Sequence, residues 1–199
     1  MQYLDEIIPV LYKDKRGNEI VIEKDEQISK VKFDKIPKLS PAFVKNGSVT
    51  AANSSPISDG ASILVLMSSK KAKEMDLKPL AKIIHFHDAA IEPNKFTIAP
   101  SKAIKELALK TDSNLEDIDL FEINEAFSMV PIVNTNILSL DDKKVNINGG
   151  AVSLGHPLGC SGARILTTLI HNLHRLKKKN GIAAICNGGG GASSVQIKI

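Results

Sequence analysis

Residues 181–199, GIAAICNGGGGASSVQIKI, contain two apolar segments separated by a run of glycines. The first segment, Ile182–Cys186, is continuously apolar, which is typical of a strand buried on both faces. The second segment alternates apolar and polar residues up to Ile199, which predicts a strand with one solvated face. Gly188–Gly191 lie between the two segments. This stretch therefore predicts the closing pair of strands of a larger sheet.

Upstream of this pair, from Leu77 onward, apolar strand-like segments alternate with helical patterns. Strands are predicted at 83–86, 121–123 and 145–147. Helices are predicted around Pro100, after a capping box formed by Ser113 and Glu116, from Asn124 or Glu125, and from a cap at Ser161 up to Asn180-Gly181. The pattern βαβαβα followed by two strands predicts an α/β layer with a mixed sheet.

The first part of the chain has a different texture. Residues 1–50 are lysine-rich and weakly periodic, and Glu19–Glu23 predicts one arm of a hairpin. Lys24–Lys38 is expected to be a solvated excursion. Ser58–Ala61 is predicted to open a helix, and Leu64–Met67 to form a short buried strand, with continuation of the helix as the alternative.

Composition excludes several classes of protein. The 199 residues suffice for one domain or a domain and a half, and no apolar run approaches the ~20 residues of a membrane span. A net charge of +4 with 4% aromatic residues and no Trp argues against a nucleic-acid binder and favours an anionic small molecule. Two cysteines are too few for a disulfide framework. Residues 1–10 lack the features of a signal or transit peptide, so we expect an intracellular protein.

Three segments place reactive or polar groups at the end of a strand, next to glycines. They are NEAF at 124–127, GGAVSLGHPLGCSGAR at 149–164 and CNGGGG at 186–191. In open α/β sheets, ligand clefts form beyond the carboxyl ends of the strands. His156 is then either a structural histidine in a tight turn or a catalytic group, and Cys186 either a packed thiol or a nucleophile or proton-transfer group. Asn124 can equally be a helix cap.

The remaining histidines give no clear metal site. His85 and His87 point to one face of an extended segment, but the sequence suggests no third ligand, so a metal site is disfavoured there. The glycine run after Cys186 offers consecutive free amides, which can form an anion or oxyanion pocket.

Together, the three segments resemble, in order, the three C-terminal signatures of the thiolase family. The resemblance extends upstream through TAANSSPISDGA at 50–61 to DEIIPV at 5–10, so it covers essentially the whole chain. HDAAIEP at 87–93 and VNINGGAVSLGHP at 145–157 are most similar to the mitochondrial-type branch that acts on acetoacetyl-CoA. The resemblance implies a thiolase-like layered fold, with a mixed sheet and helices on both faces.

The resemblance also implies a division of the chain. Residues 1–50 correspond to a remnant of the family's loop domain, 51–76 to the last segment of its N-terminal domain, and 77–199 to its C-terminal domain. The family's acylated cysteine belongs to a preceding half, and neither Cys160 nor Cys186 matches it. We therefore expect a fragment, inactive alone, whose partners are that missing half and, once complete, further copies of itself.

The activity implied is that of an acetyl-CoA C-acetyltransferase, which condenses two acetyl-CoA into acetoacetyl-CoA and CoA and catalyses the reverse thiolysis. The alternatives are a degradative 3-ketoacyl-CoA thiolase and a noncatalytic half that only binds CoA or a partner. By resemblance, the mitochondrial matrix is favoured as the location, with the cytoplasm as the alternative.

The resemblance assigns roles to individual residues. His156 matches the histidine that activates the nucleophilic cysteine and helps to bind a thioester oxygen, and Asn124 the asparagine that fixes a water there. Cys186 matches the acid/base cysteine, and Gly188 the glycine whose amide contributes to a second oxyanion hole. The positions matching CoA or acyl contacts are Lys30, Val31, Lys32, Lys35, Ser55 and Phe96. A possible potassium ion would be held by the backbone carbonyls of Ala51, Ala52, Ser54 and Val152.

Overall fold

The computed structural model describes residues 3–199 and is built around a four-stranded mixed sheet. The strands lie in the order β3 (Lys82–Ala90), β6 (Gly191–Lys198), β5 (Asn180–Cys186) and β4 (Leu120–Ile123). β6 is antiparallel to both β3 and β5, whereas β4 and β5 are parallel. The predicted closing pair is therefore the β5–β6 hairpin, and the predicted mixed sheet is confirmed.

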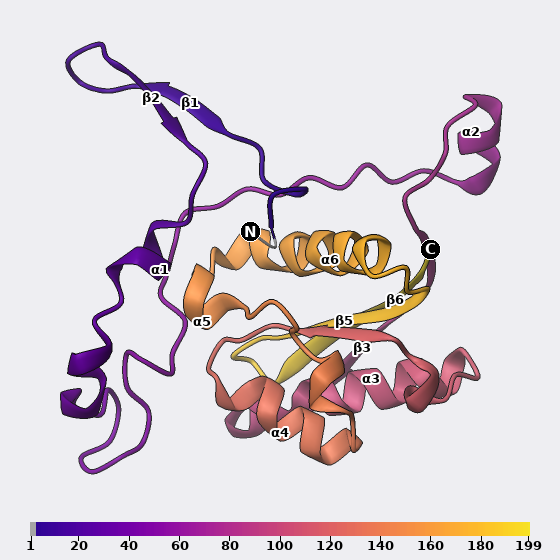
Figure 1. Cartoon of the computed structure of the whole chain (residues 1–199). Helices are drawn as coiled ribbons and strands as arrows, with labels where there is room; N and C mark the ends of the chain where they lie inside the picture. Colours follow the sequence, from indigo (N-terminus) through magenta and orange to yellow (C-terminus); the bar gives the residue numbers. More distant parts are fainter. Residues whose placement is uncertain (1–2) are drawn as a thin grey trace.

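Helices cover both faces of this sheet, as predicted (Figure 1). α3 (Ala99–Lys110) and α4 (Met129–Leu138) lie on one face and α6 (Leu158–Arg175) lies on the other. Short helical segments join them: η2 (Pro93–Ile98), η3 (Leu115–Asp117), η4 (Asp142–Lys144) and α5 (Ala151–Leu154).

Two apolar clusters hold these layers together. The cluster on the α3 and α4 side includes Ile104, Leu107, Phe121, Ile123, Val130, Ile182 and Cys186. The cluster under α6 includes Leu120, Ile165, Leu169, Ile170, Leu173, Ala183 and Ile197, with Leu166 partly buried beside it. Successive residues of β4 thus enter opposite clusters, because side chains alternate between the faces of a strand. A strand buried on both faces is mainly apolar, as residues 182–186 of β5 are.

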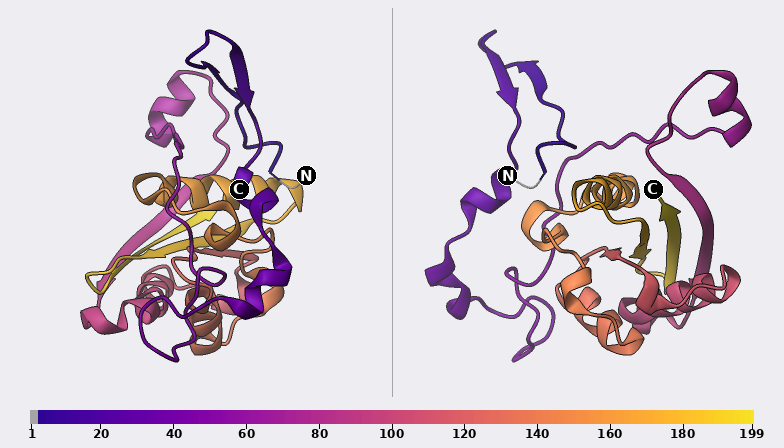
Figure 2. Two further views of the ribbon diagram at one scale, coloured as in Figure 1. Left: turned by 90° about the vertical axis from the view of Figure 1, so that its left-hand side faces the viewer. Right: turned by 45° about the vertical axis from the view of Figure 1, so that its right-hand side comes forward.

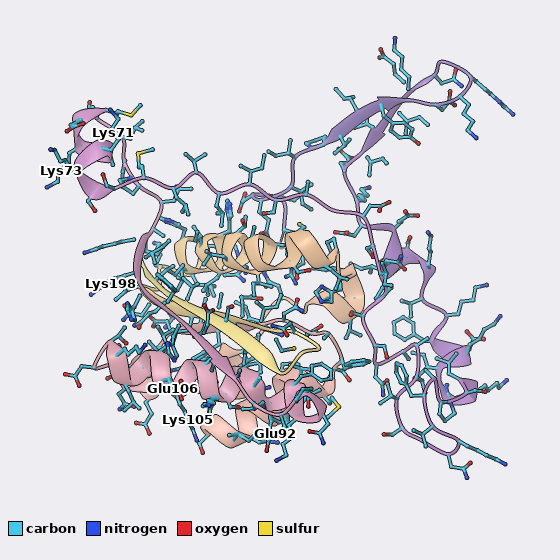
Figure 3. All side chains as sticks on the ribbon, turned by 180° about the vertical axis from the view of Figure 1, so that it is seen from behind. Lys71, Lys73, Glu92, Lys105, Glu106 and Lys198 are labelled. Carbon is cyan, nitrogen blue, oxygen red and sulfur yellow. The ribbon has the colours of Figure 1, made fainter. Side chains whose placement is uncertain are left out.

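The segment before β3 extends over and beyond this layer without a core of its own. β1 (Val10–Lys13) and β2 (Glu19–Ile22) form an antiparallel hairpin, followed by α1 (Glu26–Lys30) and η1 (Phe33–Lys38). No residue from 3 to 71 is buried, which confirms the solvated excursion at 24–38. Figure 2 shows the hairpin projecting from the layer, and Figure 3 shows α2 (Ser69–Glu74) standing away from it with Lys71 and Lys73.

Two predictions for residues 58–67 are wrong. Ser58–Ala61 does not open a helix, and Leu64–Met67 forms neither strand nor helix. This stretch is extended and crosses α6, where Ser62 Oγ lies 3.2 Å from Thr167 Oγ1 and Leu64 packs on the α6 cluster. Val65 is 81% exposed, because no neighbouring strand in the described chain pairs with this segment.

Three predicted helix boundaries are also wrong. The helix expected at Asn124 or Glu125 begins at Met129. The backbone of Asn124 is hydrogen-bonded to β5, and residues 126–128 are hydrogen-bonded to residues 53–55, so neither stretch is free to be helical. The last long helix begins at Leu158, so Ser161 lies inside it. That helix ends at Arg175, and Asn180-Gly181 are the first residues of β5.

Two smaller predictions fail for similar local reasons. The capping box of Ser113 and Glu116 does not form, because the side chain of Asn114 accepts the Glu116 N–H and caps η3 instead. The expected strand at 145–147 is reduced to isolated bridges, from Val145 to Phe121 and from Ile147 to Gly149. Within residues 3–199, none of the helices combines the length and the apolar character that crossing a bilayer requires.

Candidate functional site

The site lies at the carboxyl ends of the parallel strands β4 and β5. The Asn124 N–H donates to the Ala184 carbonyl at 2.9 Å, which carries the pairing of the two strands one residue beyond β4. The Asn124 side chain is fully buried. The next residues are held by the segment before α2, since the Ala126 carbonyl accepts both the N–H (3.1 Å) and the Oγ (2.9 Å) of Ser55. Residues 124–128, held by residues 53–55 from about 70 positions earlier in the chain, thus form one wall of the site, called here the 124–128 wall.

His156 reaches this wall from the loop between α5 and α6. Its N–H donates to the Pro56 carbonyl at 2.8 Å. Gly155 adopts φ +103, and a Cβ there would lie 2.0 Å from Ser58 Oγ. Only glycine permits both this backbone conformation and this close approach. The glycine before His156 therefore serves to bring the histidine against the 53–58 segment.

A hydrogen-bonded chain joins His156 to Asn124 and Ser161. Ser161 Oγ donates to the Pro157 carbonyl at 3.1 Å, so it accepts the proton on His156 Nδ1 at 2.6 Å. The other ring nitrogen, Nε2, is then unprotonated and accepts from Asn124 Nδ2 at 3.2 Å. This assignment of the tautomer follows from the hydrogen-bond network.

Burial and charge favour the neutral form of this histidine. Desolvation lowers the pKa of His156, and the positive charge of Arg164 lowers it further. The neutral ring presents a basic Nε2 lone pair to the site. Asn124 Oδ1 is buried and has no hydrogen-bond partner among residues 3–199. It can therefore accept a hydrogen bond from a bound water or ligand.

Glu125 and Asn146 brace the same wall, and the sequence predictions did not foresee either role. The Glu125 carboxylate accepts the Val152 N–H at 3.1 Å and so caps α5, rather than lying in the first turn of α4. Asn146 exchanges two hydrogen bonds of 2.7 Å with the backbone of Ile123 and donates a third, 3.2 Å long, to Glu125. The Asn146 side chain thus satisfies the backbone of Ile123 at the edge of β4, as a neighbouring strand would. No local sequence pattern indicates this role.

Cys186 is the last residue of β5, the strand to which Asn124 is hydrogen-bonded through Ala184. It is 8% exposed and packs in the apolar cluster with Ile123 and Val130, which Phe96 and Phe127 adjoin. Burial raises the pKa of its thiol, so the thiol form is favoured at neutral pH. No hydrogen bond among residues 3–199 joins Cys186 to His156 or Asn124. Both alternatives for Cys186, a packed thiol and a proton-transfer group, remain compatible with this position.

The glycine run after Cys186 forms a loop organised by one side chain. Asn187 Oδ1 accepts the N–H groups of Gly189 (3.0 Å) and Gly191 (3.3 Å), and the Gly190 N–H donates to the Asn187 carbonyl. The Gly188 N–H donates to no acceptor among the described residues, and Gly188 is exposed. A free amide at this position can stabilise a developing oxyanion.

The structure separates the residues expected to contact CoA into two groups. Ser55 binds Ala126, and the ring of Phe96 lies edge-on to Phe127 with centroids 6.4 Å apart, so both adjoin the wall. The others are exposed along α1, η1 and the link between them: Lys30, Val31, Lys32 and Lys35. Figure 1 shows α1 beside α5, the short helix that precedes His156.

The four residues expected to hold potassium lie on two segments that border the wall. Ser54 bridges to Phe127, and the Val152 N–H binds Glu125. The carbonyl oxygens of Ala51, Ala52 and Ser54 accept no hydrogen bond from the rest of the described chain. Neutral carbonyl oxygens of this kind suit a hard monovalent cation. The described residues contain no group of three or more His, Cys, Asp or Glu arranged to hold a metal ion.

Comparison with known proteins gives matches along the whole chain. The family model described as "Thiolase, C-terminal domain" matches residues 77–199, and "Thiolase, N-terminal domain" matches residues 1–70. A "Probable acetyl-CoA acetyltransferase" from Dictyostelium discoideum is 50% identical over 98% of this chain and 47% of its own length. Similar relatives carry names of both mitochondrial (Danio rerio) and cytosolic (Gibberella zeae) acetyl-CoA acetyltransferases.

Solved structures agree with these matches. The acetyl-CoA acetyltransferase of Bacillus anthracis superposes with a TM-score of 0.94 at 45% identity, covering 99% of this chain and 50% of that one. The Acat5 thiolase from Ascaris suum, solved with coenzyme A, gives 0.87 at 43% identity with the same coverages. The chain thus spans about half the length of the proteins that it matches.

Proposed function

The chain belongs to the thiolase family, and from this premise we propose that it is the C-terminal half of an acetyl-CoA C-acetyltransferase. The observation that carries the proposal is the hydrogen-bonded chain Asn124–His156–Ser161, which lies near the strand end that bears Cys186 and the free Gly188 amide. The reaction would interconvert two acetyl-CoA with acetoacetyl-CoA and CoA.

His156 is proposed to activate the nucleophilic thiol. Its neutral ring offers Nε2 as a base, and the Nδ1 proton is held by Ser161. Once protonated, Nε2–H can donate to a thioester oxygen, with Asn124 fixing a water beside it. In the described chain, the orphaned Asn124 Oδ1 is available for that water. The nucleophilic cysteine itself would come from a preceding thiolase half, because Cys160 and Cys186 both belong to C-terminal motifs.

Cys186 is proposed to move the α-proton. In thiolysis, its thiol would protonate the acetyl-CoA enolate that leaves, and in condensation the thiolate would remove the same proton. The raised pKa of the thiol favours the protonated state from which thiolysis starts. The enolate oxygen would accept the Gly188 N–H, which is free for this purpose.

CoA is the substrate that we propose for this site. Ser55 and Phe96 would border the pantetheine and the acyl group, because both adjoin the 124–128 wall. Lys30, Val31, Lys32 and Lys35 would contact the nucleotide from the exposed α1 and η1 region, where lysines can meet phosphates. Potassium, if bound by the carbonyls of Ala51, Ala52, Ser54 and Val152, would stiffen the loops that border the wall.

We further propose that residues 1–50 are part of the loop domain, 51–76 the last segment of the N-terminal domain and 77–199 the C-terminal domain. Once both halves are present, we expect assembly into a homo-oligomer. The proposed location is the mitochondrial matrix, with the cytoplasm as the alternative. Extended, exposed apolar residues at 61–67 support the need for a further half, which would cover them.

The Bacillus anthracis acetyltransferase is more similar to this chain in structure and sequence than a human mitochondrial 3-ketoacyl-CoA thiolase (TM-score 0.89, 36% identity). This difference favours the short-chain reaction.

The test joins this chain to the N-terminal half of a close relative and measures thiolysis of acetoacetyl-CoA. The joined enzyme should turn over and the isolated chain should not. Cys186→Ala in the joined enzyme should lower kcat by on the order of 10²–10⁴ while CoA binding persists, the usual contribution of a positioned acid or base. Cys160→Ala, a half-buried thiol in α6, is the matched control and should keep its rate.

Three results would contradict the proposal. Robust turnover by the isolated chain would refute the role of a second half, and a preference for long 3-ketoacyl-CoA substrates would favour the degradative thiolase. A Cys186→Ala enzyme that melts earlier but keeps its rate would leave Cys186 as a packed core thiol.

A further inference from the structure

The chain contains four Asn-Gly pairs, at 46–47, 148–149, 180–181 and 187–188. In such a pair, the glycine N can attack the asparagine Cγ, because the two atoms close a five-membered ring and glycine has no Cβ to obstruct the approach. The reaction requires a glycine N that is free of its hydrogen bond and a carboxamide that is accessible and polarised. We propose that Asn187-Gly188 is a site of spontaneous succinimide formation and isoaspartate modification in this protein, selected by the geometry of the glycine loop.

The attacking nitrogen is free at only one of the four pairs in the described chain. The Gly47 N–H donates to the Val44 carbonyl and the Gly149 N–H to the Asn146 carbonyl, both at 2.8 Å. Gly181 is buried inside β5, between β4 and β6. The Gly188 N–H, in contrast, has no acceptor among residues 3–199 and is exposed. Attack at Gly188 therefore breaks no existing hydrogen bond, whereas attack at the other pairs must first open a turn or the sheet.

The loop also activates the carboxamide of Asn187. Its Oδ1 accepts the N–H groups of Gly189 and Gly191, at 3.0 and 3.3 Å. When the nitrogen adds to Cγ, negative charge develops on this oxygen, and the same two donors stabilise it, as in an oxyanion hole. Asn187 Nδ2, the leaving nitrogen, donates to no described residue. At Asn148, in contrast, Nδ2 donates to Asn172 and Oδ1 accepts from Arg175, which fix the side chain away from attack.

The chemistry needs only water and hydroxide. Hydroxide removes the Gly188 amide proton, the N–Cγ bond forms, the Cγ–Nδ2 bond breaks, and ammonia leaves with a proton taken from water. Water then opens the succinimide at either carbonyl, which yields aspartate or isoaspartate at residue 187. The succinimide lacks the Gly188 N–H, and isoaspartate adds a methylene to the loop backbone. If the proposed function holds, as this consequence requires, the succinimide removes the oxyanion donor, and isoaspartate restores the Gly188 N–H but displaces it.

The experiment follows the folded chain of residues 1–199 during incubation in mildly alkaline and mildly acidic buffers. Peptide mapping and isoaspartyl methyltransferase labelling then report the modified fraction at each Asn-Gly pair. We expect residue 187 to react first and faster in alkali, residue 46 to follow, and residues 148 and 180 to lag. In urea, the four pairs should react at similar rates, because their local sequences share the same Asn-Gly unit.

Gly188→Ala is the variant that isolates the site. It should fold, because no described atom lies within 4 Å of a Cβ at this position, and it should slow modification at 187 several-fold while leaving 46 unchanged. Faster reaction at 46 than at 187 in the folded chain, or a preference for 187 that persists in urea, would overturn the proposal. None of these readouts uses thiolase activity, so the proposal can fail or succeed independently of the proposed function.

Discussion

At His156, one hydroxyl decides which ring nitrogen carries the proton. Ser161 Oγ accepts a hydrogen bond from Nδ1–H, because its own hydroxyl donates to the Pro157 carbonyl. The unprotonated nitrogen that faces Asn124 is therefore set by Ser161, which lies in the first turn of α6, five residues after the histidine. The Gly-His-Pro sequence indicates a functional histidine as one alternative, whereas Ser161 reads in the sequence only as a helix cap.

Ser161→Ala should move the proton of the neutral ring from Nδ1 to Nε2. Without the Oγ acceptor, the Nδ1 proton loses its hydrogen-bond partner. An Nε2 proton gains one if the Asn124 carboxamide turns over, because Oδ1, which has no partner among residues 3–199, can then accept it. Nitrogen-15 NMR of the imidazole distinguishes the two tautomers directly, with Ser153→Ala in α5 as a control. In the wild-type protein, the neutral ring should outnumber the charged ring at pH 6.5, the ordinary pKa of histidine, because burial lowers the pKa of His156. A variant that retains the Nδ1 proton would contradict the assigned network.

At the scale of the element, β4 carries a charge-bearing residue into the core. Glu122 is 2% exposed and faces Asn172 on α6, whose Nδ2 donates to it at 3.4 Å. Burial raises the pKa of Glu122 to about 8, although Arg164 acts in the opposite direction. The apolar pattern around this strand correctly predicts a strand, but nothing local signals that a carboxyl group is buried with it.

Glu122→Gln should stabilise the protein in mildly alkaline solution. Between its unfolded pKa of 4.5 and its folded pKa of about 8, the folded state holds a proton that the unfolded state lacks. The free energy of unfolding therefore falls as pH rises through this range, by an amount on the order of a few kcal/mol. Glutamine mimics the protonated acid and should abolish that decline, which urea unfolding at several pH values measures. The exposed Glu116→Gln is the control, and an unchanged pH slope in the Glu122 variant would refute the buried neutral carboxyl.

At the scale of the molecule, stability should be divided between two unequal parts. The buried residues lie in α2 and in the layer from β3 to β6, whereas residues 3–71 contribute none. Hydrophobic burial is the main favourable contribution to folding, so a segment without it opens at little cost.

Hydrogen exchange should therefore be fast throughout 3–68 and slow in β4, β5 and the middle of α6. Mass spectrometry of exchanged peptides can resolve these segments. After the chain is joined to an N-terminal thiolase half, residues 61–67 should gain protection, because their exposed apolar side chains would then be covered. Peptides from β5, which is buried already in the isolated chain, provide the internal control and should exchange equally slowly before and after joining. Uniform protection from Tyr3 to Ile199 in the isolated chain would contradict this division.

Apart from the strand expected at 145–147, the sequence by itself determined the order of the elements in the layer, their apolar faces and the three strand-end segments that carry chemistry. These features depend on periodicity and on glycine, which act over a few residues. The tertiary structure alone decided that Asn124 meets His156, that Ser55 and Pro56 hold both sides of the site, and that α4 begins only at Met129. Each of these depends on pairing between distant segments, where the available partner overrides local propensity. Residues 58–67 show the converse, since their apolar pattern predicts regular structure and no partner within the described chain is present to form it.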